Sequence, residues 1–178
     1  SISSHARPPT ILNGSSGWTF VTLEKASRTK YKPGLVATMP GATLRLRLSA
    51  PGVFQPTLAI QHLVSWQGMG TCELRCLDAC RCAVTPIDAH RPGASATTLD
   101  ITRLRFDADA AGDCIFEFRV LPLTASAGHK FKLVRLIVEG TKRPVRHSPA
   151  RGQAAEVHQQ HALQPQDPSP GRTVERHQ

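Results

Sequence analysis

Short runs of alternating apolar and polar residues follow one another along most of the chain. The segment TLRLRLSA (43–50) alternates strictly, with leucines on one face and arginines on the other, and CIFEFRVLP (114–122) alternates in the same way. A period of two is the pattern of a β-strand with one buried and one solvent-facing side. Further strands are predicted over 17–24, 57–66, 71–76, 82–90, 96–106 and 129–140.

The spacing of these strands predicts the fold class. They recur every roughly 10–16 residues with turns between them, and no segment has the period of an amphipathic helix, a combination typical of antiparallel sandwiches and jelly rolls. We therefore expect an all-β domain over residues 17–140, an antiparallel β-sandwich of jelly-roll type. Residues 1–16 are interpreted as a linker.

The chain changes character after residue 140. Residues 141–178 contain no aromatic side chain and are rich in Pro, Gln, His and Arg. Such a segment cannot bury enough apolar surface to offset the entropy of ordering it, so we predict a disordered basic tail. Two of its histidines, His158 and His161, would bind a transition metal only weakly, and a solvated tail is the preferred interpretation.

The formal net charge is +9, but the basic residues are dispersed. No run of like charges and no stretch of interleaved basic and aromatic residues is present, which argues against a nucleic-acid-binding protein. No apolar stretch approaches the ~18 residues of a membrane span, so we expect none within this chain. Because the chain starts at Ser1 without a signal peptide, it is interpreted as a mature chain or a fragment.

The cysteines are unevenly distributed. Cys72, Cys76, Cys80 and Cys82 lie close together, and Cys114 begins a later strand. A disulfide framework is the favoured interpretation: the DACRC turn would close a small loop, and a second bridge would reach Cys114. Four cysteines permit three connectivities, so the pairing stays open, and Cys72 is expected to remain a buried free thiol or an alternative partner.

Other uses of these thiols fit the spacing less well. Structural zinc sites usually combine two short cysteine pairs. Here four cysteines crowd one segment and only Cys114 lies elsewhere, even if His90 is counted as a further ligand. A Cys-x-x-Cys redox motif is absent. We expect no metal and no cofactor.

The chain carries no established catalytic motif: Gly-x-Ser-x-Gly, His-Glu-x-x-His, Walker A and Gly-x-Gly-x-x-Gly are all missing. Asp88 and His90 occupy positions i and i+2 of a predicted strand and would share a face, so the carboxylate could orient the imidazole. A role in a turn or against the backbone is the simpler interpretation. Asp107, Asp109 and Asp113 resemble the acidic residues of a calcium-binding loop. The full alternation of ligands is missing, so a polar turn is the favoured interpretation.

Several short motifs form a longer pattern. Their positions are Gly17 and Trp18, Lys32 to Gly34, Ala37 to Gly41, Met69 and Gly70, Cys76, Cys80, Cys82, Ile87 to His90, Cys114, and Gly128 to Lys132. In order and spacing they resemble the C-terminal β-domain of a plant and green-algal group of secretory-pathway proteins related to the SGNH/GDSL hydrolases. The resemblance covers about residues 17–138. Ala79, in place of a glycine, and the additional Cys72 depart from it.

The resemblance implies that any esterase block lies outside this chain, so no catalytic residue is carried over. It implies a disulfide-tied sandwich appended to an enzyme of the secretory pathway. The leading hypothesis is thus a non-catalytic module that binds a glycan or a partner protein through Trp66, Trp18 and Tyr31, with Asp88 and His90 as polar contacts. The alternatives are a hydrolase fragment that uses Asp88 and His90, and a structural subunit of an extracellular or ciliary assembly.

Overall fold

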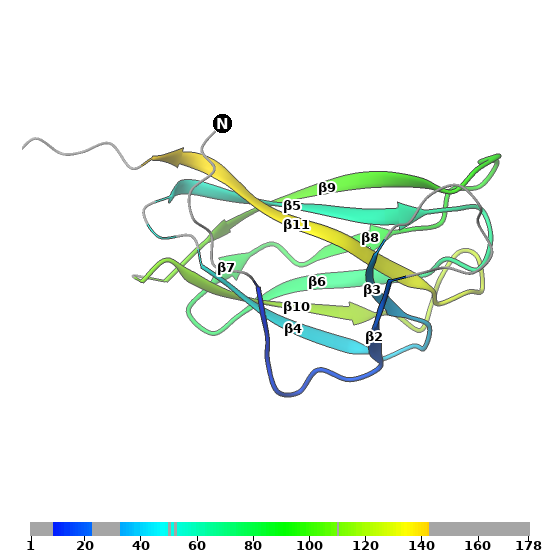
Figure 1. Cartoon of the computed structure of the whole chain (residues 1–178), viewed down its shortest axis with the longest axis horizontal. Coiled ribbons are helices and arrows are strands. Elements are labelled where there is room, and N and C mark those ends of the chain that lie inside the picture. The colour runs from blue at the N-terminus through cyan, green and yellow to red at the C-terminus, as the bar shows by residue number, and fades with distance from the viewer. Residues whose placement is uncertain (1–8, 23–32, 50, 52, 110, 143–178) are drawn as a thin grey trace, which may run out of the picture. The chain divides into compact units, whose positions relative to one another are not determined.

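The chain folds into two antiparallel β-sheets that face each other (Figure 1). This computed structural model describes residues 9–22, 33–49, 51, 53–109 and 111–142. The predicted all-β sandwich is confirmed. The predicted tail and Tyr31 lie outside the described residues, among which no helix is found that is long and apolar enough to cross a membrane.

The described residues form a five-stranded and a six-stranded sheet. The five-stranded sheet has the order β1 (Thr10–Ile11), β4 (Thr43–Ser49), β10 (Asp113–Val120), β6 (Thr71–Leu77) and β8 (Thr85–Asp88). The six-stranded sheet has the order β2 (Trp18–Val21), β3 (Gly34–Ala37), β11 (Phe131–Lys142), β5 (Val53–Val64), β9 (Thr98–Asp107) and β7 (Arg81–Cys82).

The connections are those of a jelly roll. From β3 to β6 the chain changes sheet at every step, and from β8 to β11 it does so again. The two central sets, β3-β11-β5-β9 and β4-β10-β6-β8, are each wholly antiparallel. This is the eight-stranded double-sheet arrangement, to which β1, β2 and β7 are added.

The core lies between the sheets and follows from the alternation in the sequence. In the β4–β10 register, Leu46 lies opposite Phe116 and Leu44 opposite Phe118, and all four side chains are at most 2% exposed. The facing sheet contributes a matching set of buried side chains. These are Ala37, Leu58, Ile60, Leu104, Phe106, Phe131 and Leu133.

Three local features depart from the sequence-based prediction. The turn predicted over 51–56 is mostly strand, because Gln55 takes a left-handed conformation (φ 51°) and lets β5 continue to pair with the end of β11. The strand predicted over 82–90 divides into β7 and β8, which belong to different sheets. β1 lies within the segment expected to be a linker, and it covers the edge of β4.

Candidate functional site

Two disulfides close the cysteine cluster. Cys76 is bonded to Cys82 and Cys80 to Cys114, with Cα–Cα distances of 5.6 and 5.3 Å. The first bridge joins β6 to β7 and so ties the two sheets together, and the second fixes the Asp78–Cys80 turn to the start of β10. The expectation of disulfide bonds is confirmed, and the structure selects one of the three pairings.

The remaining thiol, Cys72, is fully buried on β6 and unpaired. Burial raises the pKa of the Cys72 thiol well above its ordinary value. The sulfur atoms of Cys76, Cys80 and Cys114 lie within 4.8 Å of one another, but all three are already in disulfides. A disulfide sulfur does not provide the thiolate that zinc requires.

Trp66 lies two residues beyond the end of β5, in a loop that is held on both sides. On one side the backbone of Ser65 pairs with the 89–91 segment, through hydrogen bonds of 3.1 and 2.9 Å. On the other side Gly70 donates to the carbonyl of Lys130 at 2.8 Å, and Lys130 donates to that of Gly68 at 3.1 Å. Met69 is buried beneath the loop, whereas the Trp66 side chain is 44% exposed. The indole is thus presented from a rigid backbone.

A parallel bridge between Ser65 and His90 brings the segment that carries Asp88 and His90 beside the chain at Trp66. Their interaction is not the predicted one. Asp88 Oδ1 accepts a hydrogen bond from the backbone N–H of His90 at 2.9 Å and another from the Thr71 hydroxyl at 3.4 Å. The imidazole Nδ1 of His90 is buried and has no hydrogen-bond partner among the described residues. Asp88 therefore fixes the turn and does not orient the ring.

Sequence reasoning missed Arg91, which extends this site. Arg91 follows His90 in the chain, and its guanidinium pairs with the carboxylate of Asp100 on β9 at 2.5 Å. A hydrogen bond from the Ile101 backbone N–H, together with Arg91, holds the pKa of Asp100 below its ordinary value. We call Trp66 with Asp88, His90 and Arg91 the Trp66 platform. Its members come from separate chain segments, so only the bridge between residues 65 and 90 reveals it.

His62 lies inside the sandwich behind this platform. Its ring stacks on Phe131 at a centroid distance of 5.5 Å, and its Nε2 lies 3.2 Å from the Thr102 hydroxyl. Burial lowers the pKa of His62, an effect that the nearby Asp100 carboxylate partly opposes. The His62 imidazole is therefore a core residue whose charged form is disfavoured by burial.

The other predicted ligand-binding aromatic in the described residues, Trp18, is a packing residue. It lies on β2, partly buried against the core, with its ring edge-to-face to Phe131 at 6.2 Å. It is not part of the Trp66 platform.

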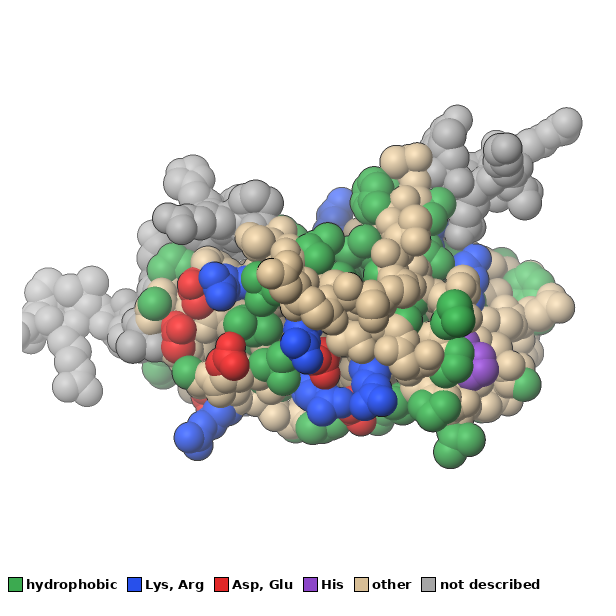
Figure 2. Space-filling model, turned by 90° about the horizontal axis from the view of Figure 1, so that it is seen from below, with side chains coloured by type: hydrophobic (Ala, Val, Ile, Leu, Met, Phe, Trp, Pro, Cys, Tyr) green, Lys and Arg blue, Asp and Glu red, His purple; other side chains and the backbone are tan. Residues whose placement is uncertain are grey.

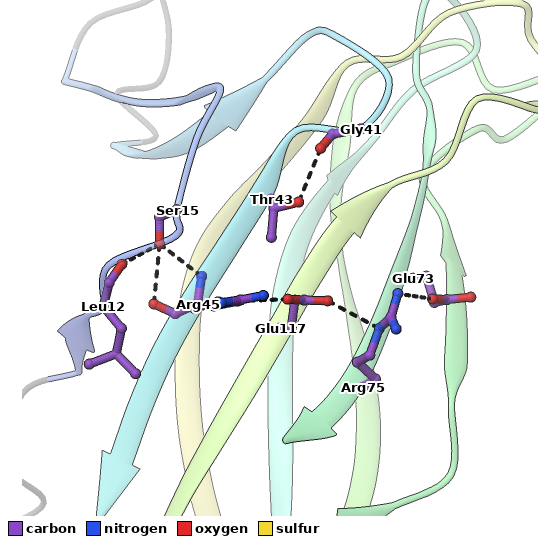
Figure 3. Close-up of polar contacts among 8 residues, drawn as sticks. All are labelled: Leu12, Ser15, Gly41, Thr43, Arg45, Glu73, Arg75 and Glu117. Carbon is purple, nitrogen blue, oxygen red and sulfur yellow. Dashed lines mark hydrogen bonds and ion pairs between the residues drawn. The ribbon is translucent and has the colours of Figure 1, made fainter. Parts of the chain in front are cut away.

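A row of charged side chains crosses the outer face of the five-stranded sheet (Figure 3). Glu117, whose side chain is only 8% exposed, accepts from Arg45 at 2.7 Å and pairs with Arg75 at 3.2 Å. Arg75 also pairs with Glu73 at 3.1 Å. Figure 2, seen from below the view of Figure 1, shows Lys or Arg side chains next to Asp or Glu side chains on the face turned to the viewer. The row links three neighbouring strands, and its charges largely neutralise one another.

No protein-family model matches this chain, and no curated protein does. Among solved structures, a two-domain esterase active on acetylated mannans, co-crystallised with mannopentaose, aligns over 76% of this chain and 37% of its own at 16% identity and a TM-score of 0.46. TmCBM61, solved with β-1,4-galactotriose, aligns over 75% of this chain and 89% of its own at 10% identity and a TM-score of 0.44.

A third similar structure is the enzymatically active domain of tailspike protein 4 of bacteriophage CBA120, with 13% identity, a TM-score of 0.35, and coverage of 75% of this chain and 19% of its own. The present chain spans only 37% of the esterase. At these identities and TM-scores the similarities transfer neither an activity nor a ligand to this chain.

Proposed function

We propose that this chain is a non-catalytic glycan-binding module and that the Trp66 platform holds its ligand. The observation that carries the proposal is the half-exposed indole of Trp66 on a loop fixed from both sides. A large apolar side chain gains nothing for folding by standing in water, so an ordered and exposed tryptophan is a binding candidate.

The chemistry of the platform matches a sugar. A pyranose ring has faces made of C–H groups and a rim of hydroxyl groups, so it requires an apolar plane beside hydrogen-bonding side chains. Trp66 provides the plane. Asp88 and Arg91, both exposed, provide an acceptor and a donor within the same bridge-linked segment.

A protein partner fits this platform less well. A stable protein interface buries about 800 Å² on each side around an apolar centre. Beside Trp66, the chain segment that pairs with Ser65 instead carries the charged or polar residues Asp88, His90 and Arg91. One aromatic ring within a polar border suits one or a few sugar residues.

Two further inferences belong to this proposal. The module is non-catalytic, because the Asp88 carboxylate is engaged by the backbone N–H of His90 and lacks the contact with the imidazole that an acid–base pair would need. It belongs to a larger protein of the secretory pathway, as its resemblance to the plant and green-algal C-terminal domains implies. The two disulfides support an oxidising compartment, extracellular or lumenal.

The test is a fluorescence titration of the full chain with a panel of neutral hexose oligosaccharides. Binding is expected to change the emission of Trp66, while Trp18 in the core gives a constant background. Trp66→Ala should weaken binding about 5- to 150-fold, corresponding to a loss of about 1–3 kcal/mol. Calorimetry measures affinity where the indole is absent.

The matched control is Phe20→Ala, which removes a different exposed aromatic ring (61% exposed) from β2. It should leave the affinity unchanged. The proposal fails if Trp66→Ala binds neutral oligosaccharides as well as the unaltered chain, if Phe20→Ala is equally impaired, or if the unaltered chain binds no member of the panel.

A further inference from the structure

A groove of about 580 Å³ lies at the end of the sandwich away from Trp66. Gln55 and Pro56, near the start of β5, line it, whereas Trp66 lies two residues beyond the end of that strand. At about 3.3 Å per residue, the two regions are roughly 30 Å apart. The other lining residues are Arg81, Cys82, Ala83, Arg105, Phe106 and Asp107. We call this set the arginine groove, and no part of it belongs to the Trp66 platform.

The two arginines of this groove differ from the arginines that pair elsewhere. Arg45, Arg75, Arg91 and Arg103 each form an ion pair with a carboxylate. Arg81 and Arg105 are exposed, and neither forms an ion pair with any residue that the structure describes. Asp107 is the single acidic residue in the lining, so the arginine groove carries a net positive charge.

The strand register places these charges side by side. Arg81 lies opposite Asp107 in the β7–β9 pair, and Arg105, two residues away on β9, shares the face of Asp107. Diagonal neighbours of this kind have Cα atoms about 7–8 Å apart, close enough for two long guanidinium side chains to converge on one anion. The disulfide from Cys82 to Cys76 fixes the short strand β7 in this position.

We propose that the arginine groove is a second binding site, which takes an acidic sugar residue carrying a carboxylate or a sulfate. The guanidinium groups of Arg81 and Arg105 bind the acid group. The Asp107 carboxylate would repel a bare anion, but it accepts hydrogen bonds from sugar hydroxyls, and the Gln55 amide both donates and accepts. The lining therefore combines cations for an acid with acceptors for hydroxyl groups.

The size and composition of the groove also favour a sugar over an acidic peptide. A volume of about 580 Å³ falls within the usual range of small-ligand sites. Besides the disulfide-bonded Cys82, the apolar lining residues are the buried Phe106 and Pro56 and the small, exposed Ala83, so the lining has no large exposed apolar side chain to hold a peptide. A peptide rich in Asp and Glu also lacks the hydroxyl donors that Asp107 would accept.

The experiment measures binding of four probes to the full chain by calorimetry at low and at physiological salt. The probes are a uronate trisaccharide, a sulfated neutral trisaccharide, the same neutral trisaccharide without sulfate, and a hexaglutamate peptide. The two acidic sugars are expected to bind, more weakly as salt rises, because the contacts are exposed ion pairs. Which of them binds more tightly distinguishes a carboxylate from a sulfate ligand.

Two substitutions on β9 form a matched pair. Arg105→Gln removes a groove cation and should weaken binding of the acidic sugar about tenfold or more. Arg103→Gln removes a charge from the same face of the same strand, but Arg103 pairs with Glu139 and does not line the groove, so the affinity should change less than about twofold. Arg81→Gln provides a second groove variant if Arg105→Gln fails to fold.

Trp66→Ala separates this site from the proposed platform, since it should leave the affinity for acidic sugars unchanged. The inference is overturned if both groove variants that fold bind like the unaltered chain, or if Arg103→Gln is equally impaired. It is also overturned if the unsulfated sugar or the hexaglutamate peptide binds as tightly as the acidic sugars, if no probe binds, or if Trp66→Ala abolishes binding of the acidic sugars.

Discussion

The two disulfides are expected to contribute unequally to stability. Cys80 and Cys114 are 34 residues apart, and Cys76 and Cys82 are 6 apart. If a disulfide acts mainly by restricting the unfolded chain, these loop lengths correspond to about 3.8 and about 2.2 kcal/mol at 25 °C. Removing the longer bridge should therefore lower the free energy of unfolding by about 1.5 kcal/mol more than removing the shorter one.

Packing acts in the same direction. Cys80 and Cys114 are 7% and 2% exposed, whereas Cys76 and Cys82 are only partly buried. Replacing the first pair by alanine consequently removes more buried sulfur from the core, which adds a cavity cost to the loss of the cross-link. The expected difference in the free energy of unfolding is therefore at least about 1.5 kcal/mol.

The assay is equilibrium unfolding in urea, followed by tryptophan fluorescence, on two double variants. These are Cys80→Ala with Cys114→Ala, and Cys76→Ala with Cys82→Ala, so that neither variant retains an unpaired bridge cysteine. Extrapolation to zero urea gives the free energy of unfolding of each. The reasoning is refuted if loss of the Cys76–Cys82 bridge costs as much as, or more than, loss of the Cys80–Cys114 bridge.

Three further predictions test the loop contact, the charged row and the buried histidine. Gly128→Ala should destabilise the fold more than Gly93→Ala, because its new Cβ would collide with the backbone of Gly68 in the Trp66 loop. Alanine at Gly93 meets open space and carries only the strain of its positive φ of 75°. Equal melting temperatures would contradict this. Glu117→Gln should cost about 1–2 kcal/mol in urea unfolding, because it loses charged hydrogen bonds to arginines that are themselves 42% and 35% exposed. Glu73→Gln, a partly exposed member of the same row, should cost less than about 0.5 kcal/mol. The reverse order would refute the shared-carboxylate argument. Burial lowers the pKa of His62 in the folded chain, so the unfolded chain binds a proton at a higher pH than the folded chain does. The free energy of unfolding should therefore fall as the pH drops below about 6.5, by at most about 1.4 kcal/mol per pH unit. His62→Gln should lack this contribution, and an unchanged pH profile would show that His62 does not cause it.

The sequence alone determined the strands whose side chains alternate. Leu44 and Leu46 on β4, and Phe116 and Phe118 on β10, reveal by their spacing both the strand and its buried face, because a period of two depends only on local backbone geometry. For the same reason the all-β fold class could be predicted.

Other local features were decided by long-range contacts. The strand predicted over 82–90 divides between the two sheets because β7 pairs with β9 of one sheet while β8 pairs with β6 of the other. The pairing of the cysteines likewise depended on which Cα atoms the fold brought within disulfide distance, a relation that no spacing along the chain encodes.

The candidate sites divide in the same way. Trp66 could be selected from the sequence as an aromatic residue at a strand end before glycines. Its exposure, and its proximity to Asp88 and Arg91, were set by the bridge between Ser65 and His90. Trp18 was also a candidate in the sequence, although core packing was its preferred interpretation, and the structure packs it against Phe131.

The arginine groove had no sequence signal at all. Arg81 and Arg105 lie on strands far apart in the chain, and each resembles any other solvent-facing arginine of a β-strand. Their register beside Asp107, and the absence of an ion pair to either within the described ranges, exist only once β7 and β9 are paired. The sequence thus determined which face of each alternating strand is buried, because that depends on local backbone geometry. The tertiary structure decided which exposed residues meet, because that depends on the pairing of distant strands.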